Sequence, residues 1–419
     1  MKKFLTLLIL AILPIFIFSQ DEPAFGIKFS GFVKTDIIWD SRQIDALREG
    51  HFLLYPKPEL PDPDGNDINA KAQFNFLSIQ TRLRGDIKGP DALGAKTSGA
   101  IEGEFFGMAD GDINGFRLRH AYVKLNWKTT ELLVGQMWHP MFITNSYPEV
   151  VSFNTGAPFL VFSRNPQIRL TQDIQNFRIV LTALSQIDFK SPGPDGQNSK
   201  YLRNAAIPSF NLNLEYSKKN TDAKTEFLIG VAGNFKRLIP RLVTTTDYKT
   251  TEGINSISGM AYVKVGLPKI IIKMAGLYGQ NMSTDYTMIG GYGETFGTDT
   301  TAMEGYMGYE NVRSFSAWAE IMTTGKKMVG GLFLGYALNL GIADDVPDLN
   351  PYLFARTNNL AYAYRISPRF IYNAGKFRIA PEIEYTVAGY GTTNAVNGKV
   401  DDPEPVGNFR FLLGVFYFF

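Results

Sequence analysis

The 419-residue sequence has no cysteine, only 3 histidines and 4 tryptophans, and almost no excess of charge. The lack of cysteine excludes a disulfide framework, so a large cooperative structure has to supply the stability. Lysine and arginine number 42 against 40 aspartates and glutamates, which removes the positive field that nucleic-acid binding requires. We therefore expect no nucleic-acid partner.

Long hydrophobic runs are also missing once the first residues have passed. The apolar stretch 4–18 follows Lys2 and Lys3 and is too short for a membrane helix. No stop-transfer charge cluster follows it, so we predict a secretory signal peptide over residues 1–19. No linker or change in composition divides the remainder, and we expect a single domain over residues 20–419.

The residues that are abundant alternate between apolar and polar. In the stretch 77–88, Leu83 and Ile87 share one face of an extended strand with other apolar residues, while Arg82, Arg84 and Asp86 share the other. An arginine facing lipid costs about 2 to 4 kcal/mol at the bilayer midplane. The charged face must therefore look into water, and the apolar face is free to look into lipid.

Similar segments recur along the whole chain and predict about 16 strands, with 18 possible. Short connections between them alternate with long polar ones such as 41–70, 187–207 and 281–311. This pattern is typical of an all-β, transmembrane, antiparallel up-and-down β-barrel with both ends in the periplasm. A barrel of this size has an aqueous lumen, and we expect it in the outer membrane, surrounded by lipid.

The chain ends in an aromatic-rich stretch, residues 408–419. Its outer face from Phe409 to Phe419 carries no charge, which predicts a closing strand that pairs with the first strand. The final Phe419 resembles the terminal signature that the outer-membrane barrel insertion machinery reads, so we expect that machinery as a partner.

Catalytic and metal motifs are scarce. His51, His120 and His139 are not at metal-ligand spacing, and no nucleophile motif occurs, so we expect neither an enzyme nor a cofactor. The stretch "DGDING" opens like a calcium loop, with its ligand oxygens on Asp110, Asp112 and Asn114, but the distal glutamate is missing. A tight turn is the favoured interpretation, and calcium stays an option.

Two further segments concern the lumen. Arg117 and Arg119 have the parity of the lipid side, and a β-bulge near Arg119 and His120 would return them to the lumen; a position in the rim above the bilayer is the alternative. The loop 139–165 is long and apolar for an exposed loop. We expect it to fold into the lumen, with packing on the rim or on a neighbouring subunit as the alternatives.

The stretches "FRLRHAYVKL", "LLVGQMWHP" and "RNPQIRLTQ", in this order, resemble the DcaP-like trimeric porins of Gram-negative outer membranes. The resemblance covers chiefly residues 25–172. It implies sixteen strands, a constricting third loop, a homotrimer and arginine-rich pore walls. It further implies that Gly135 and Gln136 mark the strand that leads into the constriction and that four arginines line the pore: Arg117, Arg119, Arg164 and Arg169.

These observations predict a porin that lets small hydrophilic solutes, with a modest preference for anionic ones, diffuse through its lumen. We expect a transverse field between opposed groups that line the pore, with Arg82, Arg84 and Arg169 facing Asp86, Glu102 and Glu104. The alternatives are a non-conducting barrel that serves as a subunit or scaffold of an outer-membrane complex, and an outer-membrane hydrolase.

Overall fold

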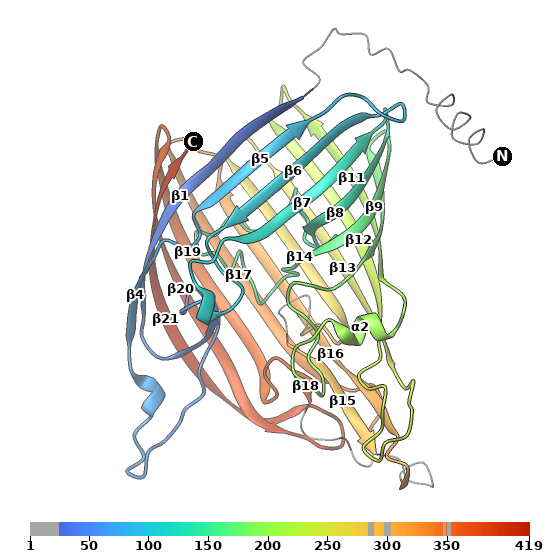
Figure 1. Cartoon of the computed structure of the whole chain (residues 1–419). Coiled ribbons are helices and arrows are strands. Elements are labelled where there is room, and N and C mark those ends of the chain that lie inside the picture. Colours follow the sequence, from blue (N-terminus) through green and yellow to red (C-terminus); the bar gives the residue numbers. More distant parts are fainter. Residues whose placement is uncertain (1–24, 284–288, 297–302, 347–348, 350–352) are drawn as a thin grey trace, which may run out of the picture.

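The computed structural model describes residues 25–283, 289–296, 303–346, 349 and 353–419, and the predicted signal peptide lies outside these ranges. The chain forms a closed antiparallel barrel of sixteen wall strands (Figure 1). The first and last strands, β1 (Gly26–Asp40) and β21 (Val400–Phe418), pair from Phe32 with Phe418 to Asp40 with Arg410. This pairing confirms the closure predicted from the C-terminal stretch and leaves no free sheet edge.

The other wall strands follow in sequence order around the barrel, and β4 and β5 together make one wall strand. Their bounds are β4 (Gln73–Leu77), β5 (Arg82–Lys88), β6 (Lys96–Glu104), β7 (Arg117–Asn126), β8 (Thr130–Trp138), β9 (Arg164–Ile174), β10 (Phe177–Leu184), β11 (Ser209–Asn220), β12 (Thr225–Leu238), β13 (Ile254–Gly266), β14 (Ile270–Gln280), β16 (Met307–Thr323), β17 (Met328–Gly341), β19 (Leu360–Ala374) and β20 (Phe377–Thr393).

The predicted alternation decides which side of the wall each residue faces. Along β21, Phe409, Phe411 and Tyr417 are about half exposed on the outside, whereas Arg410 is completely buried. The same division holds along β1, where Val33 is exposed on the outside. Exposed aromatic residues lie near both ends of this outer surface, such as Phe177 beside a short turn and Phe210 beside a long loop, as they do at the two interfaces of a membrane-spanning barrel. The outer wall is therefore a lipid-facing surface.

The two ends of the barrel differ. Both described chain ends lie at the end with the short turns, the upper end in Figure 1, while the long connections gather at the other end. In outer-membrane barrels the short turns are periplasmic and the long loops extracellular, so this arrangement agrees with the predicted orientation. No helix in the described ranges is long and apolar enough to cross a membrane.

The predicted strand over 77–88 is wrong over its first residues. The wall strand is interrupted at residues 78–81 between β4 and β5, with a backbone hydrogen bond of 3.2 Å from Thr81 N to Ser78 O. Thr81 Oγ1 accepts a hydrogen bond from the backbone N–H of Lys34. The interruption turns Ile79, which the alternation places outside, into the apolar core of the lumen, where it is buried.

The predicted bulge near Arg119 is confirmed. Glu102 pairs with His120 and Gly103 with Leu118, so Arg119 is the extra residue in β7. A bulge leaves carbonyl groups without ladder partners. Gln136 on β8 donates hydrogen bonds from Nε2 to the carbonyl oxygens of Leu118 (3.3 Å) and Arg119 (3.1 Å) and so satisfies them.

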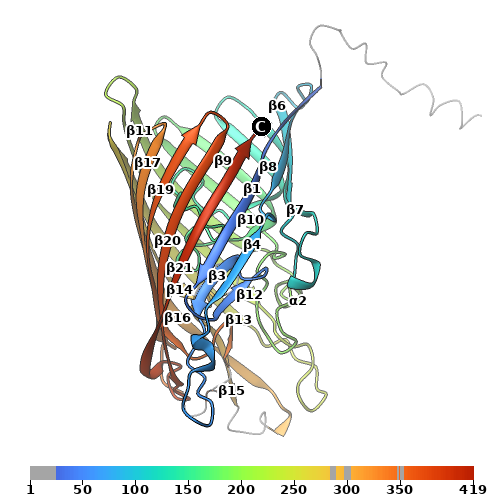
Figure 2. The ribbon, with the colours of Figure 1, turned by 90° about the vertical axis from the view of Figure 1, so that its left-hand side faces the viewer.

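Two long loops enter the barrel. The L1 hairpin, which we define as β2 (Ile44–Leu47) and β3 (Phe52–Pro56), folds inward from the loop end, and β3 is buried along its whole length. Loop L3, defined as residues 139–163, runs between β8 and β9 and contacts β16, β19 and β20 on the opposite wall. The predicted inward folding of this loop is thus observed. Figure 2 shows the L1 hairpin beside β4 and β21.

The remaining elements lie at the loop end. They are η1 (Ile68–Ala70), η2 (Asp110–Asp112), α2 (Lys200–Asn204), β15 (Gly291–Phe296) and β18 (Phe354–Ala355). Strands β15 and β18 pair with each other, and β15 also pairs with the first residues of β16, so the wall extends beyond the barrel rim there.

Candidate functional site

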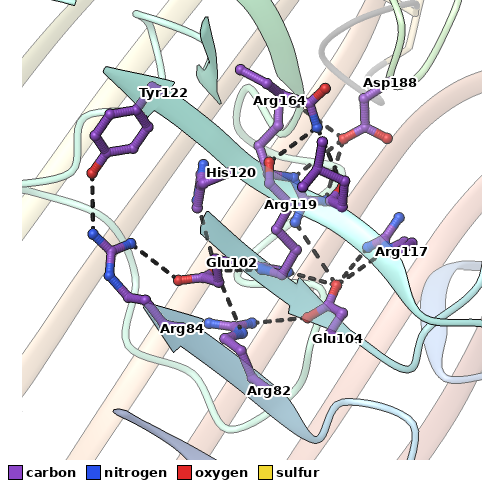
Figure 3. A network of polar contacts seen from close by, with 12 residues as sticks. Arg82, Arg84, Glu102, Glu104, Arg117, Arg119, His120, Tyr122, Arg164 and Asp188 are labelled. Atoms are coloured by element: carbon purple, nitrogen blue, oxygen red, sulfur yellow. Dashed lines mark hydrogen bonds and ion pairs between the residues drawn. The ribbon is translucent and has the colours of Figure 1, made fainter. Parts of the chain in front are cut away.

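The inner wall of β5, β6, β7 and β9 carries a cluster of charged side chains (Figure 3). Glu104 is at its centre: its carboxylate oxygens lie 2.6 Å from Arg119, 2.7 Å from Arg117 and 3.1 Å from Arg82. Neighbouring Glu102 accepts hydrogen bonds from Arg119 Nε at 2.6 Å and from Arg84 Nη1 at 3.2 Å. We call this group, together with Arg164, the arginine–glutamate cluster.

The outer members of the cluster extend it along the wall. Arg84 donates to Asp86 at 2.7 Å and to the Tyr122 hydroxyl at 3.1 Å. Arg164 pairs with Asp188 at 3.2 Å, and its Nη1 lies 3.9 Å from Glu104. Five guanidinium groups thus face four carboxylates, which leaves one positive charge in excess.

Exposure separates the cluster into two parts. The side chains of Arg82 and Arg84 are 21% and 28% exposed, whereas those of Arg117, Arg119 and Arg164 are buried at 6% or less. A buried guanidinium needs a paired counter-charge because desolvation of an unpaired ion is costly. The buried arginines therefore stabilise the wall through their ion pairs. Arg82 and Arg84 are the members of the cluster whose side chains are accessible from the lumen.

The predicted transverse field is wrong in its geometry. Arg82 and Arg84 do not face Glu102 and Glu104 across the lumen. The four residues lie on adjacent strands, with Arg82 directly opposite Glu104 and Arg84 opposite Glu102 in the β5–β6 ladder. Opposite charges at paired positions on one face attract each other at short range, and their fields largely cancel at a distance.

Arg169 lies apart from the cluster. Its guanidinium donates to Gln167 Oε1 at 3.0 Å and to the carbonyl of Trp138 at 2.7 Å. It forms no ion pair with any carboxylate in the described part of the chain. The structure thus brings together Arg117, Arg119 and Arg164 of the four arginines implied by the resemblance, and leaves the fourth as a separate cation.

Strands β1, β19 and β20 hold loop L3 by its backbone. Glu382 accepts hydrogen bonds from the N–H of Val151 (2.6 Å) and Ser152 (3.3 Å). Lys34 donates to the carbonyl of Val151 at 2.8 Å, and Arg365 donates to that of Ala157 at 2.8 Å. Charge-assisted bonds of this kind are stronger than neutral ones. The loop is therefore fixed at several points rather than lying loosely in the lumen.

The L1 hairpin is held by side chains of β1, β19 and β21. Arg365 donates from Nη2 to the carbonyl of Leu54 at 3.1 Å, so one guanidinium binds both inner segments. Arg410 donates to the carbonyl of Gly50 at 2.7 Å. His51 pairs with Asp36 of β1 at 2.7 Å. Burial lowers the pKa of His51, and the hydrogen bond with Asp36 opposes this shift.

An aromatic core joins the two inner segments inside the barrel. Phe106 stacks on Phe153 of L3 with ring centroids 3.9 Å apart, and Phe52 of the hairpin lies 5.2 Å from Phe162 of L3. All four rings are almost completely buried. The lumen at this level is therefore partly filled with apolar side chains, in contrast to the uniformly aqueous lumen that the alternation predicts.

Two cavities remain on either side of L3 toward the turn end. The first, of about 280 Å³, lies against β7 to β11 and has charged lining residues that include Lys124, Glu131, Arg169, Asp173, Arg178 and Glu215. The second, of about 260 Å³, lies against β16 to β21, β1 and the start of β5, and has lining residues that include Gln80, Arg82, Tyr147, Glu149 and Arg378. Both expose cations and polar groups, so each is able to hold a small hydrophilic solute.

The calcium option has an ordinary structural explanation. The carboxylate of Asp110 accepts hydrogen bonds from the N–H of Arg48 and Glu49, and that of Asp112 accepts from the N–H of Met108 and Ala109. Asp112 thus holds the backbone of its own turn, and Asp110 holds that of the turn between β2 and β3. The described ranges contain no group of three or more acidic, histidine or cysteine side chains that is able to hold a metal ion.

The sequence did not identify the groups that anchor L3. The loop ligands are Lys34, Arg365, Glu382 and Ser316, whose hydroxyl donates to the carbonyl of Phe159 at 3.0 Å. Their role depends on where a loop of 25 residues lands inside the barrel. That position follows from tertiary packing, for which the strand pattern contains no signal.

The fold and the inner loops define a transmembrane β-barrel of the outer-membrane type. No family model and no curated protein matches the chain. Its structure is similar to the outer membrane channel DcaP of Acinetobacter baumannii, with a TM-score of 0.65 and 16% identity over 96% of this chain and 99% of that one. The resemblance predicted from the sequence is thus confirmed for the fold.

Two other solved structures are similar. One is the trimer form of OmpT, an outer membrane protein of Vibrio cholerae, with a TM-score of 0.54 and 11% identity over 94% of this chain and 100% of that one. The other is an anion-selective porin from Comamonas acidovorans, with a TM-score of 0.51 and 11% identity over 94% and 100% of the two chains. At these identities the comparisons establish the fold.

Proposed function

We propose that the protein is an outer-membrane porin through which small hydrophilic solutes diffuse passively. The observation that supports this most strongly is the position of L3, which crosses the lumen of a closed barrel and leaves a polar cavity on each side. A barrel wall of sixteen strands is wide enough for an aqueous passage. Selectivity then comes from the size and charge of the narrow regions, without chemistry.

The charge along both cavities supports a modest preference for anions. Arg169 in the first cavity and Arg378 in the second form no ion pair with a carboxylate in the described ranges. Glu149 in the second cavity is neutralised by Lys273 at 2.6 Å. The similar porin from Comamonas acidovorans is anion-selective, which agrees with this preference.

Liposome swelling combined with reversal potentials tests the proposal. We expect proteoliposomes to admit small neutral and anionic solutes, and a salt gradient to give a reversal potential on the anion side that Arg169→Gln reduces. Lys218→Gln, which removes an exposed charge that lines neither cavity, is the matched control. Strong cation selectivity would contradict the anion preference, and absence of swelling would contradict the channel.

A specific observation favours a second candidate, a barrel that does not conduct and serves as a subunit of an envelope complex. The L1 hairpin and L3 share one aromatic core that joins the two walls, with Phe52, Phe153 and Phe162 almost completely buried. If this core closes every path between the two ends, the long loops at the extracellular end would be the functional surface.

We further propose four features that belong to the porin but that the fold alone does not decide. They are export by cleavage of the signal peptide 1–19, a single domain over 20–419, assembly as a homotrimer, and insertion through recognition of Phe419. The last side chain is about half exposed on the outer wall, and its N–H bonds to the carbonyl of Gly31 at the seam. One similar structure is a trimer, which supports the third feature.

A further inference from the structure

The outer wall over β9 to β16 is hollowed, although it faces lipid. A groove of about 660 Å³ over β9 to β13 adjoins one of about 600 Å³ over β13 to β16, and Ile257 lines both. The floor is formed by Gly233, Gly259 and Gly276. A Cβ atom added at any of them would have at most one neighbouring atom within 4 Å, so the space above these glycines is open. The sides are apolar and include Leu181, Phe210, Leu212, Tyr278 and Phe315. We call this hollow the outer groove.

Two arginines stand on the outer wall at the extracellular margin of the outer groove. Arg237 follows Phe235 by two residues on β12, and Arg313 precedes Phe315 by two residues on β16, so both have the parity of the outer face. Both are partly exposed. Neither forms an ion pair with any carboxylate in the described part of the chain.

The arginines are held in place by neutral groups. Arg237 donates from Nη1 to Asn255 at 3.0 Å, and Arg313 donates from Nε to the carbonyl of Gly341 at 3.3 Å. Gln280, which pairs directly with Arg313 across the ladder, lines the outer groove. A positive polar margin is thus continuous with the apolar hollow.

From this arrangement we infer that the outer groove binds a lipid with phosphate groups from the extracellular leaflet. The phosphates are bound by Arg237 and Arg313, and an acyl chain lies over the glycines. The two arginines lie three strand spacings, or roughly 15 Å, apart, which suits a large headgroup with more than one phosphate. Guanidinium groups match phosphate geometry in a bidentate manner. The site is distinct from the lumen and goes beyond the proposed channel function.

A second copy of the chain is the competing occupant. To fill the outer groove, a neighbouring barrel would have to present bulky apolar groups over the glycines and acidic groups to both arginines. The apolar outer wall supplies the first, but the acidic groups would have to come from its rim and meet both arginines at once. A phosphorylated lipid supplies an apolar chain and anionic groups in one molecule. Its headgroup in the extracellular leaflet lies at the level of the two arginines.

Native mass spectrometry of the purified full chain in detergent tests the inference, with lipid A, its dephosphorylated form and inorganic phosphate as probes. We expect Arg237→Gln/Arg313→Gln to lower the affinity for lipid A at least tenfold and to leave the dephosphorylated form unaffected. We expect Gly259→Leu/Gly276→Leu to lower binding of both lipids. The matched controls are Arg203→Gln, at an exposed position of α2, and Gly330→Leu on β17, and both should bind lipid A normally.

Several outcomes would overturn the inference. Lipid A binding that is unchanged in both double variants would place the lipid elsewhere. Inorganic phosphate that binds at Arg237 and Arg313 as tightly as lipid A would make this a site for the free anion. Dissociation of an oligomer by Gly259→Leu/Gly276→Leu in the absence of lipid would make the outer groove an interface between copies.

Discussion

Glu104 is the residue whose neutralisation should destabilise the barrel most clearly. Its side chain is completely buried, and three guanidinium groups lie within 3.1 Å of its carboxylate. Glu104→Gln keeps the shape but removes the charge, so five arginines of the cluster would face three carboxylates. Loss of one partner from a buried ion pair costs about 3 to 5 kcal/mol because the remaining charge stays buried. We expect the free energy of unfolding to fall by about this amount.

Urea unfolding in lipid vesicles, followed by tryptophan fluorescence, measures this change. Asp86→Asn is the matched control, because Asp86 is 49% exposed and pairs only with Arg84 at the edge of the same cluster. An exposed pair contributes about 0 to 1 kcal/mol. If the two variants unfold within about 1 kcal/mol of each other, the cluster does not behave as a buried network and the reasoning is refuted.

Four other predictions follow from single contacts. Gln136→Leu should lower the free energy of unfolding by about 1 to 3 kcal/mol in the same urea assay, because the bulge carbonyls lose their donor; Gln136→Glu, which cannot donate, should behave alike. Gly135→Ala should reduce the yield of folded barrel on a heat-modifiability gel, because its φ is +135° and a Cβ would lie 2.2 Å from the carbonyl oxygen of Ala121; a normal yield would contradict this. Arg365→Met should raise the noise of single-channel currents, because both inner segments lose an anchor, and an unchanged trace would contradict it. Burial lowers the pKa of His51, so the stability of the docked hairpin should be complete above about pH 6.5 and fall as the pH drops below it; His51→Gln should flatten this dependence, measured as the free energy of unfolding at pH 7.5 and pH 5.

The sequence predicts the wall well because a wall residue has only two directions in which to point. The period of two places Arg82, Arg84 and Asp86 on the water-facing side of the wall, and the conflict of parity at Arg119 is enough to predict a bulge. The interruption at Ile79 was missed, since its parity is compatible with an unbroken strand. Here the tertiary structure overrides the local pattern. Burial in the inner core removes the apolar side chain of Ile79 from the water of the lumen, which is favourable, whereas a position facing lipid adds no such gain in free energy.

Contacts inside the barrel were harder to predict, because alternation gives the direction in which a side chain points and not the partner that it meets. Alternation shows that Arg82 and Glu104 both face inward, but it does not show whether they meet across the lumen or along the wall; the register of β5 with β6 decides that. The apolar character of 139–165 predicted that this loop folds inward. Its packing against a hairpin from the first loop could not be predicted. This packing depends on contacts between segments about 100 residues apart, such as the contact of Phe52 with Phe162.

Single-channel recording in planar lipid bilayers tests the central claim most directly, with wild type compared with Arg82→Ala/Arg84→Ala. The account predicts stepwise conductance in groups of three for a trimer, with an anion preference that the double variant weakens, because these two side chains are the accessible members of the arginine–glutamate cluster. A correctly folded, heat-modifiable barrel that never conducts would contradict it and would mean that the aromatic core closes the lumen.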